Sequence, residues 1–150
     1  MADTHADIRL VEDSPSDIKL ALHAFRIANL TNSVHVARDG VEALEFMFGS
    51  ASSGDERVPA RPKVVLLDLK LPKVDGLEVL RRIRGSEQHQ MLPVVILTSS
   101  DEESDLMRSY KLGVNSYIRK PVNFTDFAEA TRQLGMYWLV LNETPPTPLR

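Results

Sequence analysis

The sequence predicts an α/β fold built from a parallel sheet with helices on both faces. Short aliphatic runs recur along the chain, and longer stretches with apolar residues three and four positions apart separate them; this is the spacing of amphipathic helices. The run Val64–Leu67 lacks apolar–polar alternation, which indicates a strand buried on both faces. Strands that alternate with helices in this way form a mostly parallel sheet.

The first strand is predicted over 7–12, and strong capping residues mark the start of the next helix, predicted over 14–29. Ser14 is expected as the N-cap, with Pro15 at the first helical position and Asp17 three residues after the cap. The helix carries an apolar stripe at Ile18, Ala21, Leu22 and Phe25. The stripe predicts an amphipathic helix.

The later elements repeat this alternation. The predicted strands are 33–38, 63–68, 92–98 and 115–120. The predicted helices are 39–49, 75–84, 99–113 and 123–141. Ser100 and Glu103 have capping-box spacing at the start of the fourth helix, Gly113 should end it, and Asn123 should cap the last one. The segment 49–62, rich in Gly, Ser and Pro, is predicted to be a long loop.

Right-handed crossovers leave few topologies for this order of elements. We expect a flavodoxin-like (βα)5 doubly wound parallel sheet with strand order 2-1-3-4-5. The chain of 150 residues is predicted to form one domain over 1–150, with a core over about 6–141 and an extended tail over 142–150.

Composition excludes several kinds of protein. The net charge of -3 argues against a basic nucleic-acid interface, and the absence of cysteine excludes disulfides, thiolate metal sites and cysteine catalysis. The N-terminus lacks the layout of a signal peptide, and no apolar run approaches the roughly 18 residues of a membrane span. We expect a cytoplasmic protein with no nucleic-acid or membrane partner.

Polar side chains stand where the predicted strands end. They are Glu12 and Asp13 after the first strand, Asp68 after the third, Thr98 at the fourth and Lys120 at the fifth. The carboxyl ends of parallel strands meet at one edge of a sheet. Three carboxylates there would repel one another, and a hard cation such as Mg²⁺ relieves the repulsion through oxygen ligands. A hydroxyl and an ammonium beside the metal suit a phosphoryl group.

These residues and their spacing resemble the receiver domain of two-component response regulators over about residues 6–141. The matching pieces are LVEDSPSD, VVLLDLKLPKVDG, VVILTSS and YIRKPV. Pro72 and Gly76 stand four and eight residues beyond Asp68, as in the family's D-x-x-x-P-x-x-x-G turn. Each piece alone is a weak signal, but their order and spacing together are specific.

The resemblance implies that Asp68 accepts a phosphoryl group from the phosphohistidine of a histidine kinase, and that Thr98 and Lys120 bind the phosphoryl oxygens. Tyr117 would be the switch aromatic, which turns inward as Thr98 is drawn toward the phosphoryl group. Such a protein is a phosphoacceptor in signalling that catalyses only its own phosphorylation and dephosphorylation, and it is not an enzyme acting on other substrates.

The resemblance also implies a Mg²⁺ site. Asp13 and Asp68 would be direct ligands, Glu12 would act through water, and Lys70 would contribute its backbone carbonyl. The side chains of Lys70 and Ser100 occupy positions where such domains tune hydrolysis. The metal would therefore lie beside the phosphoacceptor.

A subfamily is indicated as well. The loop FMFGSASSGDERVPARP, the stretch SSDEESDLMRSYKLGVNSYIRKPV and the ending MYWLVLNETPPTP resemble bacterial phytochrome-associated response regulators. This implies a light-sensing histidine kinase, a bacteriophytochrome, as the phosphodonor. The residues after Leu141 are too few for an effector domain, so we expect a stand-alone receiver whose output passes through protein contacts to an unknown downstream protein.

The last helix is apolar around most of its circumference. Its apolar residues are Leu134, Met136, Tyr137, Trp138, Leu139, Val140 and Leu141. We expect a homodimer interface on the face of the fourth and fifth helices and the fifth strand, including Tyr137, Trp138, Val140 and Leu141. The alternative is a longer core helix.

Three other functions share part of this pattern of residues. A phosphorelay shuttle that passes the phosphoryl group to a downstream histidine phosphotransfer protein is not separable from a terminal output protein by sequence. A flavodoxin-like FMN carrier needs a Ser/Thr-rich phosphate loop where this chain has Glu12 and Asp13. A Mg²⁺-dependent phosphatase with an aspartyl nucleophile needs a second acid where Lys70 stands.

Two positions depart from simple expectation. Arg9 lies inside the first strand, where an unpaired guanidinium is costly to bury. We expect its stem to pack while its head reaches solvent or an acid. Pro121 matches a position that is often cis in the family, although X–Pro bonds are generally trans.

Overall fold

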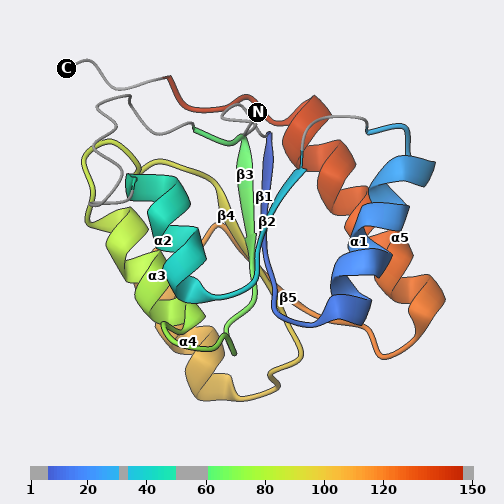
Figure 1. The fold of residues 1–150 in the computed structure, drawn as a ribbon, viewed down its shortest axis with the longest axis horizontal. Coiled ribbons are helices and arrows are strands. Elements are labelled where there is room, and N and C mark those ends of the chain that lie inside the picture. Colours follow the sequence, from blue (N-terminus) through green and yellow to red (C-terminus); the bar gives the residue numbers. More distant parts are fainter. Residues whose placement is uncertain (1–6, 31–33, 50–60, 147–150) are drawn as a thin grey trace.

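The computed structural model describes residues 7–30, 34–49 and 61–146, in which five strands and five helices alternate (Figure 1). The strands are β1 (Ile8–Val11), β2 (Val34–Ala37), β3 (Val64–Leu67), β4 (Val94–Thr98) and β5 (Ser116–Arg119). The helices are α1 (Pro15–Ile27), α2 (Gly40–Phe48), α3 (Gly76–Arg84), α4 (Glu103–Lys111) and α5 (Phe124–Gly135). A π-helical segment, Met136–Leu141, continues α5.

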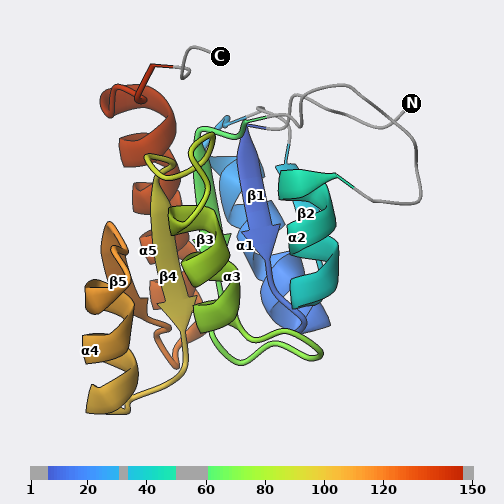
Figure 2. The same ribbon diagram turned by 90° about the vertical axis from the view of Figure 1, so that its left-hand side faces the viewer.

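The sheet has the predicted order β2-β1-β3-β4-β5, and every neighbouring pair is parallel. Helices α1 and α5 cover one face, and α2, α3 and α4 cover the other (Figure 1). A quarter turn shows β1 and β4 running toward the same edge (Figure 2). The flavodoxin-like fold class is therefore confirmed, and the carboxyl ends of the strands share one rim.

The apolar run of β3 faces a separate core on each side of the sheet. Val65 and Leu67 belong to the core beneath α2 and α3. Val64 and Leu66 belong to the core beneath α1 and α5. Successive side chains of a strand point to opposite faces, so a strand with helices on both faces must be apolar at every position. This confirms the burial that the sequence predicted.

Two helix starts are as expected. The Ser14 side chain accepts a hydrogen bond from the Asp17 amide at 3.3 Å, and the Asn123 side chain accepts one from the Asp126 amide at 3.1 Å. Each side chain satisfies an amide that has no partner within its own helix. These caps fix the points at which the chain leaves the rim and enters α1 and α5.

The start predicted for α4 is wrong. The helix begins at Glu103 and not near Ser100, and its N-cap residue, Glu102, makes no side-chain capping bond. The Ser100 hydroxyl instead donates a hydrogen bond to Asp105, so the loop after β4 extends further. The predicted stop is confirmed, because Gly113 follows the helix with a φ of +96°, a conformation that favours glycine.

The head of Arg9 is expected to reach solvent or an acid; the residue is fully buried, so solvent is excluded, and the acid whose charge acts on it is Glu42. Its guanidinium carbon lies 3.2 Å from the ring centre of Phe46, a cation–π contact. Its Nε and Nη1 atoms have no hydrogen-bond partner among the described residues. Burial lowers the pKa of Arg9 to about 9, and the charge of Glu42 opposes that shift.

The expectation of a cis Lys120–Pro121 bond is also wrong. The described part of the chain contains no cis peptide bond, and trans is the lower-energy form of X–Pro bonds. Most of the predicted 49–62 loop lies outside the described residues, as does the end of the 142–150 tail. Within the part of the chain that the structure covers, no helix combines the length and the apolar character needed to cross a membrane.

Candidate functional site

The carboxyl ends of four strands bring the predicted site residues together at the rim. The Asp68 amide donates to the carbonyl of Val11 at 3.0 Å, which ties the end of β3 to the end of β1. The Lys120 amide donates to the carbonyl of Thr98 at 2.7 Å, which ties the end of β5 to the end of β4. The positions of these side chains are thus set by the sheet itself rather than by long loops.

Three carboxylates face one another across the ends of β1 and β3. Glu12, Asp13 and Asp68 each place an oxygen within 4.8 Å of the others. Glu12 and Asp68 are buried, whereas Asp13 is exposed. Hard oxygen ligands that are partly open to solvent fit a divalent cation that keeps some of its waters. The donor set therefore fits a divalent metal ion.

The ammonium of Lys120 balances this negative charge. Its Nζ lies 2.5 Å from Glu12 Oε1, 2.8 Å from Asp17 Oδ2 and 3.3 Å from Asp68 Oδ2. Burial alone would lower the pKa of Lys120, but hydrogen bonds to Asp17 and Glu12 and the charge of Asp68 raise it instead. Lys120 therefore stays charged at neutral pH and touches the carboxylate of Asp68.

Glu12 is the carboxyl group with the most perturbed acidity at the rim. Burial raises its pKa to about 7, and the hydrogen bond from Lys120 opposes this shift. The charge of Asp68 raises the pKa of Glu12 further. The Ser14 amide donates to Glu12 Oε2 at 3.1 Å. A proton and a metal ion thus compete for Glu12 near neutral pH.

The residues that the sequence predicted as a switch lie on β4 and β5. Thr98 is fully buried, and its Oγ1 accepts a hydrogen bond from the Ser100 amide at 3.3 Å. The Tyr117 hydroxyl is buried, and the Ser100 side chain is close enough to oppose part of the effect of burial on its pKa. Burial raises the pKa of Tyr117. The hydroxyl of Tyr117 thus already points inward in this structure.

Lys70 and Gly76 shape the turn that follows Asp68. The Lys70 amide donates to Asp68 Oδ1 at 3.4 Å, while its ammonium lies 3.2 Å from Asp105 Oδ2 in α4. A Cβ at Gly76 would lie 2.3 Å from the carbonyl oxygen of Asp68. Since real Cβ atoms do not approach so closely, only glycine lets α3 start this close to Asp68.

Two site residues were missed from the sequence. Asp17 contacts Lys120 through its side chain, whereas its sequence position predicted only a role at the start of α1. Its place in the first helical turn after the rim brings it near the site but does not give the direction of its side chain. Asp105 is buried between Ser100 and Lys70, and the neighbouring acids of its segment gave no sign that it differs from them.

The predicted dimer residues do not share one environment. Tyr137, Val140 and Leu141 are 50%, 59% and 70% exposed. Trp138 is largely buried in the core beneath α1 and α5. The outward side of the π-helical segment is therefore formed by the other three residues.

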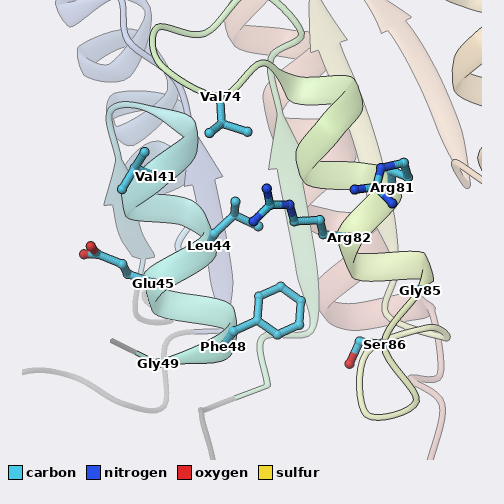
Figure 3. A pocket seen from close by; sticks show the side chains of 10 residues that line it. All are labelled: Val41, Leu44, Glu45, Phe48, Gly49, Val74, Arg81, Arg82, Gly85 and Ser86. Carbon is cyan, nitrogen blue, oxygen red and sulfur yellow. The ribbon is translucent and has the colours of Figure 1, made fainter. Parts of the chain in front are cut away.

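A separate cavity of about 560 Å³ opens between α2 and α3 (Figure 3). Figure 3 shows Leu44 and Phe48 of α2 facing Arg82 of α3 across it. None of the predicted site residues lines this cavity. The cavity therefore lies apart from the predicted phosphoacceptor site.

Comparison with known proteins identifies the family. The model of the response regulator receiver domain matches residues 8–132. The chain is 41% identical over 138 residues to a probable methanogenesis regulatory protein, FilR2, of Methanothrix harundinacea. That match covers 92% of this chain and 86% of the relative.

Solved structures give the same family. The phosphorylated cyanobacterial phytochrome response regulator RcpA superposes with a TM-score of 0.85 at 34% identity, covering 95% of this chain and 99% of RcpA. The bacteriophytochrome response regulator AtBRR has a TM-score of 0.69 at 51% identity, covering 94% of this chain and all of AtBRR.

Proposed function

This chain belongs to the response regulator receiver domain family, and on that premise we propose that Asp68 accepts a phosphoryl group from a sensor histidine kinase in a Mg²⁺-dependent reaction. Receiver domains are phosphoacceptor signalling proteins and bind a divalent metal at their acidic pocket. One observation carries the proposal: the buried Asp68 carboxylate lies between two further carboxylates and a buried ammonium.

In the proposed reaction an oxygen of Asp68 attacks the phosphorus of phosphohistidine, the P–N bond breaks, and its electron pair stays on the imidazole. Mg²⁺, held by Asp13, Asp68, the backbone carbonyl of Lys70 and, through water, Glu12, would neutralise charge on the carboxylates and the phosphoryl oxygens. Lys120 already contacts Asp68 Oδ2 at 3.3 Å, so its ammonium stands beside the transferred group and binds its oxygens.

Thr98 and Tyr117 form the proposed switch. The Thr98 hydroxyl donates to a phosphoryl oxygen, and the half-buried side chain of Tyr117 packs into the space behind it. The two packings differ by a population shift and not by a change of fold. The burial of both hydroxyl groups in the described structure supports this arrangement.

We infer that the phosphodonor is a bacteriophytochrome. The support is the 51% identity to AtBRR over almost the whole chain and the superposition with RcpA. The output passes through protein contacts, and we propose a homodimer as one of them. Tyr137, Val140 and Leu141 offer an exposed apolar surface for it.

The test is incubation with acetyl phosphate, with and without Mg²⁺, followed by intact mass measurement. We expect the wild-type protein to gain one phosphoryl group only when Mg²⁺ is present, and Asp68→Asn to gain none. Asp75→Asn serves as a control for loss of an acid outside the site, and it should behave as the wild type does. The absence of a Mg²⁺-dependent adduct on the wild-type protein would contradict the proposal.

A further inference from the structure

Asp105, in the first turn of α4, is a buried acid outside the proposed phosphoacceptor and metal site. It is 4% exposed, whereas its neighbours Glu102 and Glu103 are exposed. A buried carboxylate is costly unless charged or polar groups hold it. Other charged or polar groups must therefore stabilise the Asp105 carboxylate.

Asp105 joins the two loops that flank Asp68. Its Oδ2 accepts a hydrogen bond from Ser100 Oγ at 2.6 Å, and the same oxygen lies 3.2 Å from Lys70 Nζ. Ser100 belongs to the loop after β4, and Lys70 belongs to the loop after β3. One carboxylate of α4 thus holds a group from each loop.

Both of those loop residues also reach the phosphoacceptor machinery through their backbones. The Lys70 amide donates to Asp68 Oδ1 at 3.4 Å. The Ser100 amide donates to Thr98 Oγ1 at 3.3 Å. A continuous chain of contacts therefore runs from Asp68 through Lys70, Asp105 and Ser100 to Thr98.

We propose that Asp105 is a positioning residue that holds the Lys70 ammonium away from the phosphoryl group on Asp68 and thereby shortens the lifetime of the aspartyl phosphate. The inference rests on the proposed phosphorylation of Asp68. In the step concerned, water attacks phosphorus and the P–O bond to Asp68 breaks. Asp68 leaves as the carboxylate, and inorganic phosphate and a proton are released.

The direction of the effect follows from the charge and reach of Lys70. Its side chain is 59% exposed, and only the ammonium end is tied to Asp105. A lysine stem is long and flexible and carries a compact charge. An ammonium released from Asp105 would move to the phosphoryl dianion two residues away and obstruct the approach of water.

The first test compares wild type with Asp105→Asn. Asparagine has nearly the same size and still accepts a hydrogen bond from Ser100, but it has no charge to hold Lys70. Each protein is phosphorylated with acetyl phosphate and Mg²⁺, freed from the donor, and followed by intact mass. We expect the adduct of Asp105→Asn to decay more slowly by about threefold, the scale of a partly exposed ion pair.

A double-variant cycle separates this role from a structural one. In a Lys70→Met background, at whatever rate that variant itself decays, adding Asp105→Asn should cause no further slowing. Asp105→Glu, which keeps the charge, should decay at the wild-type rate. Glu103→Gln removes an exposed acid from the same helical turn and is the matched control. Equal slowing in Asp105→Glu, or slowing that persists without Lys70, would overturn the inference.

Folding is checked first by circular dichroism, and Asp105→Ser replaces Asp105→Asn if the latter does not fold. If the wild-type adduct forms and all variants decay alike, Asp105 does not set the lifetime, while the proposed function stands. If no Mg²⁺-dependent adduct forms on the wild-type protein, both the proposed function and this inference are overturned.

Discussion

Burial of the Glu12 side chain raises its pKa and so makes the free energy of unfolding depend on pH near neutrality. Its pKa is about 7 in the folded protein, against an ordinary value of 4.5. Between these values the folded state binds more protons than the unfolded state at this residue. The contribution of Glu12 to the free energy of unfolding of the metal-free protein therefore rises as pH falls from 7 toward 4.5.

Stabilisation by a bound metal ion should have the opposite pH dependence. A proton on Glu12 must be lost before its carboxylate can take part in binding the metal. We expect Mg²⁺ to raise the thermal unfolding midpoint more at about pH 8 than at about pH 6. Glu12→Gln carries no titrating group, so its Mg²⁺ effect should be smaller and nearly the same at both pH values. An equal Mg²⁺ effect at both pH values in the wild-type protein would contradict this account of Glu12.

Sequence predicted those site residues that stand at strand ends. Asp68, Thr98 and Lys120 could be placed because parallel strands bring their carboxyl ends to one edge. Asp17 and Asp105 could not be placed in the same way, because their roles depend on which face of a helix turns toward the rim. That orientation is set by packing between elements, and the local sequence does not reveal it.

At the scale of elements, the junction between β3 and α3 requires glycine at position 76, because the backbone of Asp68 and Leu69 lies too close for a Cβ. Gly76→Ala would bring a Cβ to 2.3 Å from the carbonyl oxygen of Asp68, so the start of α3 must shift. We expect a loss of about 1–3 kcal/mol in the free energy of unfolding, typical of overpacking, and slower phosphorylation of Asp68. Urea unfolding and the rate of adduct formation measure the two effects.

Gly85→Ala is the matched control, because the nearest atom to a Cβ there lies 3.4 Å away. Its free energy of unfolding should stay within about 0.5 kcal/mol of the wild-type value. If Gly76→Ala were as stable and as reactive as Gly85→Ala, close packing of α3 against Asp68 would not be what requires glycine.

Local capping chemistry predicted the starts of α1 and α5 and the end of α4. The side chains of Ser14 and Asn123 cap as expected, because each accepts a hydrogen bond from an amide in the first turn of its own helix. Ser100 has the same local spacing, but its hydroxyl bonds to the buried Asp105 carboxylate. A charged acceptor binds a hydroxyl more strongly than a neutral one does, so a contact formed by the folded chain overrides the capping pattern.

At the scale of the whole molecule, the outward side of the π-helical segment is the surface proposed for a second copy. We expect a dimer in analytical ultracentrifugation, and we expect Leu141→Glu to shift it toward monomer, because a charge in an apolar interface is costly to desolvate. Ile27→Glu changes another exposed apolar residue, 63% exposed, and should leave the dimer intact. A wild-type monomer at every concentration tested, with and without phosphodonor, would contradict the proposed dimer.

The strand order and the layers could be predicted because right-handed crossovers leave few topologies for a chain of alternating strands and helices. The partner surfaces could not be derived with the same certainty. Trp138 lies in the same apolar stretch as Tyr137 and Leu141 but is largely buried in its own core. An apolar helix alone does not say which of its sides faces the protein interior.

The central claim is that the phosphoryl group resides on Asp68, and chemical trapping tests it most directly. The protein is phosphorylated with acetyl phosphate and Mg²⁺ and then treated with borohydride, which reduces an aspartyl phosphate to homoserine. Peptide mass spectrometry then locates the reduced residue. We expect homoserine at position 68, and only in the sample that contained Mg²⁺. Reduction at Glu12 or Asp13, or at no residue, would contradict phosphorylation of Asp68.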